Sequence, residues 1–172
     1  MIETDRLLLR PYTEKDLDFY AGLWANSNIV RYIGKGKTKT FAEAKDSLGH
    51  WVSEYEYGFG LQAVKLKAED KLIGHAGLVR QTIEGKEEIE IGYWLLPDYW
   101  GRGLAKEAAI GLREYGLEEK GLSKLISLIN PNNPASIFVA KKAGLSYEKT
   151  VRLSEGDTLV YSIRMHRQFS SS

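Results

Sequence analysis

The sequence predicts an α+β fold, with a mixed, mostly antiparallel sheet of about seven strands flanked by about four helices. Apolar residues alternate with period two in several short runs, such as Ile89–Leu95, and recur at helical spacing in others. The runs follow the order strand, two helices, three strands, helix, strand, helix, two strands. Three consecutive strands joined by short polar turns indicate an antiparallel meander rather than a doubly wound parallel sheet.

Length and composition indicate one ordinary globular domain. Of 172 residues, 43% are hydrophobic and 27% are charged, which is close to the usage of folded domains. We therefore expect residues 1–169 to form a single domain and residues 170–172 to form a frayed tail. The net charge of +1 gives no reason to expect nucleic acid or an anionic membrane as a partner.

Cysteine content and hydropathy limit the chemistry and the location. The chain has no cysteine, which excludes a disulfide framework and a catalytic thiol and fits a reducing compartment. No apolar run approaches the roughly 18 residues of a membrane span, and no signal-like run begins the chain. We therefore expect a cytoplasmic protein.

Local signals place the first strand and the first two helices. The first strand is expected at Arg6–Arg10. Thr13 with Asp16, and Thr40 with Glu43, have the spacing of N-terminal capping boxes, so a helix should follow each pair.

The remaining elements follow from alternating runs and turn residues. A hairpin is expected around residues 67–71, and a turn at 84–86 leads into the strand that ends near Leu95. Asn133 is expected to cap a helix that begins at Pro134 and ends at Gly144. The other predicted elements are a helix from about Leu104 to Gly121, a strand at Lys124–Ile129, and a final hairpin of residues 145–152 and 158–167.

The link between the strand ending near Leu95 and the helix opening at Leu104 has the features of an anion site. Gly101 and Gly103 let the backbone come close to a ligand, and the first turn of a helix leaves N–H groups unpaired. Arg102 and Lys106 add positive charge. The alternative is a tight strand-to-helix connection without a ligand.

Two known nucleotide-binding motifs do not fit this turn. A dinucleotide fingerprint needs a third small residue, and Lys106 occupies that position when the count begins at Gly101. A P-loop needs Gly-Lys-Ser/Thr at its end, and this sequence does not have it.

The same stretch resembles the acyl-CoA signature of the GNAT N-acetyltransferase superfamily, and most closely its RimJ/RimL-like branch. The matching residues are Glu90-Ile91-Gly92-Tyr93-Trp94, Pro97, Trp100-Gly101-Arg102-Gly103-Leu104-Ala105 and Glu107-Ala108. The superfamily motif is usually Gln/Arg-x-x-Gly-x-Gly/Ala. Trp100 stands where the motif has Gln or Arg, whereas Gly103 and Ala105 match its Gly and Gly/Ala positions. The element order of the whole chain is also that of the GNAT fold.

The resemblance implies an N-acetyltransferase that uses acetyl-CoA as cosubstrate and no metal. A primary amine, either a protein N-terminal α-amine or a small-molecule amine, would attack the thioester directly in a ternary complex. The protein could also assemble as a homodimer. The residues implied in binding acetyl-CoA are Trp94, Leu95, Leu96, Trp100, Gly101, Arg102, Gly103, Leu104, Ala105, Lys106, Asn133 and Ser136.

Two residues are candidates for catalysis. The resemblance places a carboxylate at Glu90, which would act as a base directly or through a water; the alternative is a solvated strand charge. Asn133 and Ser136 match the family's Asn-x-x-Ser, although both could simply cap a helix. The family's frequent thiolate-protonating tyrosine would fall at Ala140, so Ser136 becomes the candidate acid.

Some alternatives stay open. The chain could be a non-catalytic acyl-CoA-binding module. The helix aromatics are expected in the core, but Trp24, Tyr32 or Trp51 could line an acceptor pocket. The three histidines, His50, His75 and His166, lack metal-ligand spacing and are expected to be structural.

Overall fold

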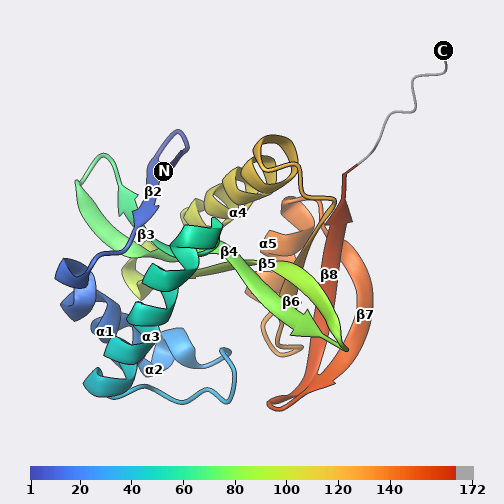
Figure 1. Cartoon of the computed structure of the whole chain (residues 1–172), viewed down its shortest axis with the longest axis horizontal. Helices are drawn as coiled ribbons and strands as arrows, with labels where there is room; N and C mark the ends of the chain where they lie inside the picture. The colour runs from blue at the N-terminus through green and yellow to red at the C-terminus, as the bar shows by residue number, and fades with distance from the viewer. Residues whose placement is uncertain (166–172) are drawn as a thin grey trace.

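The computed structural model describes residues 1–165, which form an eight-stranded sheet with helices on both faces (Figure 1). The spatial order of the strands is β1-β2-β3-β4-β5-β6-β8-β7. Their bounds are β1 (Ile2–Glu3), β2 (Leu7–Pro11), β3 (Gly60–Leu66), β4 (Lys71–Ile83), β5 (Lys86–Leu95), β6 (Lys124–Ile129), β7 (Ser146–Leu153) and β8 (Gly156–Arg164). Residues 166–167 of the predicted last strand, His166 among them, and the expected tail lie outside the described residues.

The helices confirm the predicted fold class. Their bounds are α1 (Leu17–Ala25), α2 (Ser27–Val30), α3 (Phe41–Glu54), α4 (Leu104–Glu114) and α5 (Pro134–Lys142). Two small elements were not predicted, the two-residue strand β1 and the one-turn helix α2, because both are too short for a periodic pattern. After α4 the chain makes a π turn, Tyr115–Glu119, before Gly121 ends the segment at φ 68°. None of the described helices is long and apolar enough to cross a membrane.

The sheet is antiparallel except between β5 and β6. These parallel neighbours share a single register pair in the described chain, Glu90 opposite Ile126. The other side of β5 stays paired with β4 along its whole length, from Lys86 opposite Ile83 to Leu95 opposite Gly74. The backbone of β5 after Glu90 therefore has a strand partner on one side only.

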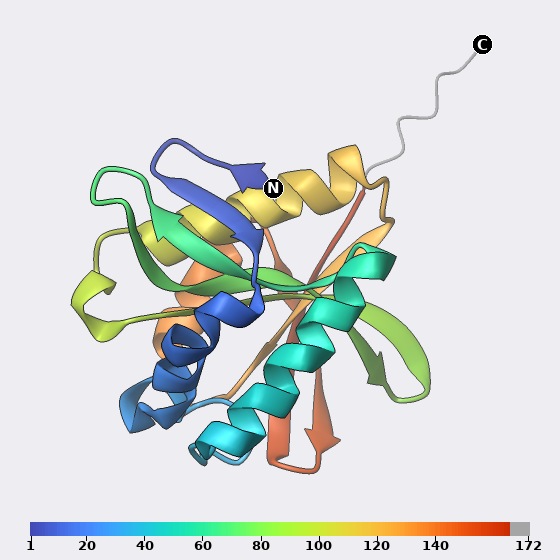
Figure 2. The same cartoon turned by 60° about the vertical axis from the view of Figure 1, so that its left-hand side comes forward.

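The two faces of the sheet carry different helices (Figure 2). Ala63 and Val64 are neighbours on β3 and point to opposite faces. Ala63 packs with Tyr12 and Tyr20 in the cluster under α1 and α3, whereas Val64 belongs to the main core with Leu104 and other residues of α4 and α5. β5 lies between these two layers, so residues from both layers can contact it.

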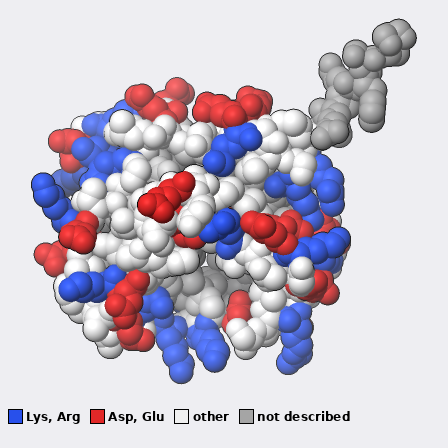
Figure 3. Space-filling model, viewed as in Figure 1, with Lys and Arg blue, Asp and Glu red and all other residues white. Residues whose placement is uncertain are grey.

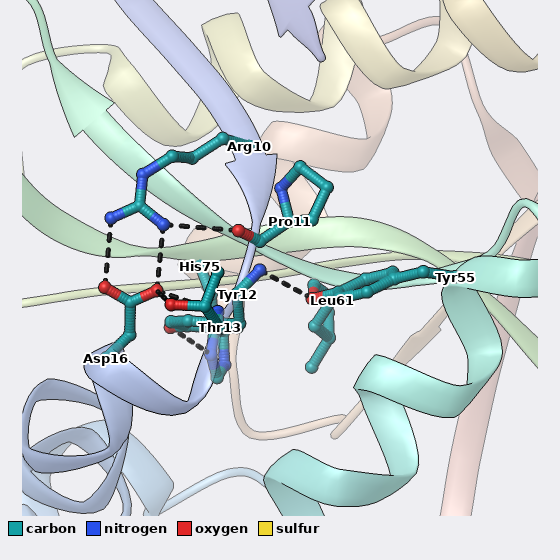
Figure 4. Close-up of polar contacts among 8 residues, drawn as sticks. All are labelled: Arg10, Pro11, Tyr12, Thr13, Asp16, Tyr55, Leu61 and His75. Carbon is teal, nitrogen blue, oxygen red and sulfur yellow. Dashed lines mark hydrogen bonds and ion pairs between the residues drawn. The ribbon is translucent and has the colours of Figure 1, made fainter.

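Both predicted capping boxes are present: the Thr13 box opens a 3-10 turn, Glu14–Asp16, that leads into α1, and the Thr40 box opens α3. The Thr13 backbone N–H donates to the Asp16 carboxylate at 2.9 Å, and Arg10 pairs with the same carboxylate at 2.8 and 3.0 Å (Figure 4). The Thr40 box with Glu43 starts α3 in the same way.

A histidine lies buried beneath these helices. His75 of β4 is buried, and its Nδ1 lies 3.0 Å from the hydroxyl of Tyr12 (Figure 4). Burial lowers the pKa of His75 to about 3, so the ring is neutral at ordinary pH. This arrangement agrees with the predicted structural role.

Candidate active site

One cavity of about 750 Å³ opens where β5 and β6 run apart. Its wall combines β5, β6, the turn before α4, the start of α5, the segment around α2 and the tip of the β7–β8 hairpin. Residues that line it include Asn28, Tyr32, Gln81, Glu90, Tyr93, Trp94, Leu95, Trp100, Gly101, Gly103, Leu104, Ala105, Lys106, Asn133, Ser136, Glu155 and Asp157. Most of the predicted site residues therefore meet at one place.

One end of the cavity is the glycine turn. Gly101 and Gly103 have φ values of 76° and 74°, a conformation that other residues adopt only with strain. The first intrahelical hydrogen bond of α4 joins the Glu107 N–H to the Gly103 carbonyl at 3.1 Å. The N–H groups of residues 104–106 precede this bond and can bind an anion, as a pyrophosphate requires.

The two positive side chains of the turn are placed differently. Lys106 lines the cavity. Arg102 is absent from the cavity lining within the described chain, and its guanidinium lies 5.1 Å from the centroid of the Tyr99 ring. The indole N–H of Trp100 donates to the Leu95 carbonyl at 2.9 Å and so ties the turn to the end of β5.

A clamp outside the cavity holds this turn, and the sequence analysis missed it. The Arg6 guanidinium donates to a Glu107 carboxylate oxygen at 2.7 Å and to the Arg102 carbonyl at 2.9 Å. Thr4 donates to the other Glu107 oxygen at 2.5 Å. No local pattern reveals these contacts, because they join the first strands to α4.

The end of β5 supplies a wall of the cavity. Trp94 and Leu95 line it, whereas the Leu96 N–H donates to the Ile73 carbonyl at 2.8 Å and is used within the sheet. The Trp94 ring lies 4.8 Å from that of His75 and 6.2 Å from that of Trp24, measured between centroids.

Glu90 lines the cavity at the point where β5 and β6 still touch. It is partly buried, and its Oε1 accepts a hydrogen bond of 2.9 Å from the Gln81 amide. Burial raises the pKa of Glu90 to about 7; the nearby charge of Glu155 also raises it, whereas bonds from Gln81 and the Leu128 backbone oppose the rise. The environment is thus not that of a fully solvated charge.

Gln81 is a residue that the sequence analysis missed although a signal existed. Glu84 and Gly85 both have positive φ, of 50° and 78°, and form a two-residue hairpin turn. Such a turn fixes the register of β4 and β5 and sets Gln81 diagonally from Glu90 on one face.

The start of α5 brings in Asn133 and Ser136. Asn133 caps the helix by accepting the Ser136 N–H at 3.2 Å, and Pro134 is the first helical residue, as predicted. The Ser136 hydroxyl lies 3.0 Å from the hydroxyl of Tyr93 on β5. In the sequence, Tyr93 stood out only as a member of the alternating run Ile89–Leu95 and of the family motif, with no role of its own.

Of the three aromatic residues considered for an acceptor pocket, only Tyr32 lines this cavity in the described chain. Trp51 donates its indole N–H to the Tyr20 hydroxyl at 2.9 Å, and Trp24 packs between Trp94 and Lys39.

Among the described residues, no group of three or more His, Cys, Asp or Glu side chains could hold a metal ion. On the face shown in Figure 3, Lys and Arg are interspersed with Asp and Glu.

Comparison with known families identifies the class of protein. The family model described as Acetyltransferase (GNAT) domain matches residues 6–146, which is most of the chain. The fold and the family define an acetyltransferase enzyme, and the chain belongs to the GNAT family.

Individual relatives agree with this assignment. The uncharacterized protein YkkB of Bacillus subtilis is 35% identical over 164 residues, which cover 92% of each chain. Spermidine N(1)-acetyltransferase of Escherichia coli is 29% identical over 142 residues, covering 81% of this chain and 73% of the relative. A structure of spermidine N-acetyltransferase from Vibrio cholerae with CoA and spermine superimposes with a TM-score of 0.78 over 94% of this chain and 96% of that one; at 20% identity, it shows the fold alone.

Proposed function

We propose that the protein transfers the acetyl group of acetyl-CoA to a primary amine by direct attack in a ternary complex, as a RimJ/RimL-like member of its family. The observation that carries this proposal is the continuous cavity from the glycine turn to Glu90, in which both substrates can meet. Acetyl-CoA supplies a thioester, whose carbonyl carbon reacts with an amine. The absence of cysteine favours direct attack, since no acyl-thiol enzyme can form.

The cofactor end is formed by the free amides of residues 104–106 and the Lys106 ammonium, which suit a pyrophosphate. We infer that the β5 backbone near Trp94 and Leu95 holds the pantetheine arm, because it has no strand partner on the β6 side. Asn133 fixes the first turn of α5 and so orients Ser136 toward the cavity.

Glu90 is the proposed base. A carboxyl with a pKa of about 7 is half ionised at neutral pH and can accept a proton from an amine. An α-amine with a pKa near 8 is already about one-tenth neutral at pH 7, so it needs less help than a lysine near 10.4. Glu90 therefore matters most for a basic acceptor.

The acceptor is proposed to be a protein N-terminal α-amine or a small-molecule amine. Three carboxylates line the cavity, Glu90, Glu155 and Asp157, whereas Lys106 is its one basic lining residue in the described chain. This charge distribution favours a cationic acceptor. The spermidine activity named for the Escherichia coli relative fits such an acceptor. A cytoplasmic location and a homodimer remain predictions.

A thiol-release assay tests the proposal. Purified protein with acetyl-CoA is offered polyamines, amino sugars and peptides with free N-termini, and CoA release is followed. We expect release above the uncatalysed rate with at least one class. Binding of acetyl-CoA without release for any amine would favour the alternative, a non-catalytic acyl-CoA-binding module.

A further inference from the structure

Tyr93 and Ser136 bring two hydroxyl groups into contact at the cavity wall. Their oxygens lie 3.0 Å apart, and both side chains are partly buried and line the cavity. Ala140, where the family's usual tyrosine would stand, is 3% exposed and packed in the main core. A phenol therefore does reach this cavity, but from β5 instead of α5.

The direction of the hydrogen bond follows from acidity. Two hydroxyls at this distance share one bond, and the phenol is the stronger donor because it is more acidic than an aliphatic alcohol. Burial raises the pKa of Tyr93, and the charge of Glu90 adds to this, although the bond with Ser136 opposes it. The phenol is therefore protonated at neutral pH and can donate, which leaves the Ser136 O–H free to donate to a third group.

We propose that Tyr93 is a positioning residue whose O–H donates to the Ser136 oxygen and so directs the Ser136 O–H toward the sulfur that leaves the acetyl group. This inference rests on the proposed function. Transfer forms a C–N bond and breaks a C–S bond. The amine gives a proton to Glu90, which passes it to solvent, and the released thiolate takes its proton from solvent. Tyr93 and Ser136 keep their own protons and act through hydrogen bonds.

The pair should work better than Ser136 alone for two reasons. A serine hydroxyl rotates freely, and accepting a bond from Tyr93 limits its O–H to other directions. Hydrogen bonds in a chain also polarise one another, so a hydroxyl that accepts a bond becomes a stronger donor.

Steady-state rates of matched variants test this arrangement. Tyr93→Phe removes only the hydroxyl. It should lower kcat about two- to tenfold, the effect of losing one neutral hydrogen bond, and leave the KM for acetyl-CoA unchanged. Ser136→Ala should lose at least as much, and the double variant no more than Ser136→Ala alone. Tyr147→Phe is the control, because its hydroxyl lies 2.9 Å from that of Thr150 in an exposed pair and should not affect the rate.

CoA binding gives a second readout that does not depend on turnover. A thiol with a pKa near 8.5 becomes a thiolate as pH rises, and a Ser136 O–H directed at the sulfur should bind the thiolate more tightly than the thiol. Calorimetry from pH 6 to 10 should therefore show CoA affinity rising about two- to tenfold in the parent. Tyr93→Phe and Ser136→Ala should both flatten that rise, whereas Tyr147→Phe should keep it.

The outcomes separate this inference from the function on which it rests. It is overturned if Tyr93→Phe keeps the parental kcat and the parental pH dependence of CoA binding, or if the two single losses multiply in the double variant. If the parent shows the pH-dependent binding, Tyr93→Phe and Ser136→Ala flatten it, and the parent still releases no thiol with any amine, the Tyr93–Ser136 arrangement is supported and the proposed function is refuted. Melting curves of all variants verify that each is folded.

Discussion

The guanidinium of Arg6 donates to the backbone carbonyl of Arg102 at 2.9 Å, across 96 positions of sequence. The same side chain pairs with Glu107 in the first turn of α4. Between these two contacts lies Gly103 of the glycine turn, and glycine can adopt many conformations. The Arg6 contacts restrict that freedom before any ligand binds.

Breaking the clamp should weaken acetyl-CoA binding without removing a direct contact. Arg6→Met should raise the Kd about three- to tenfold, because the turn must then be ordered during binding. Calorimetry measures the change. Arg10→Met is the matched control, since it breaks a similar bidentate pair with Asp16 away from the turn. It should lower the melting temperature and leave the Kd unchanged; equal effects of both variants on the Kd would contradict the clamp.

The phosphate turn predicts which nucleotide stabilises the protein. Acetyl-CoA should raise the melting temperature, and NAD should not. Lys106→Glu should reduce the shift more than Arg102→Glu, because only Lys106 lines the cavity, whereas Arg102 lies over the Tyr99 ring. Thermal shift measurements with both ligands test this. Stabilisation by NAD equal to that by acetyl-CoA would refute the assigned cofactor.

Removal of the proposed base should change the pH profile. In the parent, kcat/KM should rise with an apparent pKa near 7, as Glu90 ionises. Glu90→Gln should lower turnover at pH 7 about 10²-fold for a basic amine, with partial recovery as the amine loses its own proton at higher pH. Glu88→Gln is the control on the same strand, because Glu88 pairs with Lys124. An unchanged rate from pH 6 to 9 in Glu90→Gln would leave Glu90 no role as a base.

Glu90 should also affect stability, with a sign that follows from its pKa. The folded-state value of about 7 lies above the ordinary 4.5, so between these pH values the folded protein holds a proton that the unfolded chain releases. The free energy of unfolding therefore falls as pH rises from 4.5 to 7. We subtract the melting temperature of the parent from that of Glu90→Gln at each pH. This difference should be more positive at pH 8 than at pH 5. A difference that does not depend on pH would contradict the raised pKa.

Gly74 should tolerate no side chain. A Cβ there would lie 2.1 Å from the Trp94 carbonyl oxygen and 2.8 Å from the Leu95 Cα. Gly74→Ala should destabilise the fold by about 1–3 kcal/mol or more and weaken acetyl-CoA binding, since it displaces this wall of the cavity. Gly49→Ala is the control within α3, where a Cβ meets no atom within 4 Å; it should stabilise by up to about 1 kcal/mol. If Gly74→Ala and Gly49→Ala had the same melting temperature, β4 and β5 could move apart at Gly74 without loss of stability, and this prediction would be wrong.

Sequence alone was sufficient wherever a structure depends on neighbours in the chain. The Thr40 capping box, the Asn133 cap and the start of α4 at Leu104 were predicted and are confirmed, because each needs only residues within one turn. The fold class followed from the order of such elements, and the family motif predicted that most of the candidate site residues lie between Glu90 and Lys106.

Tertiary structure decided the contacts between distant segments. Arg6 and Arg102 meet because β2 and α4 pack near each other, and Tyr93 meets Ser136 because the first turn of α5 lies beside the last part of β5; no spacing within one segment encodes either contact. The pKa of Glu90 depends on burial among β4, β6 and the β7–β8 tip, which its own strand cannot show. Local propensities act over a few residues, whereas burial and long-range hydrogen bonds arise only when the sheet brings those residues together.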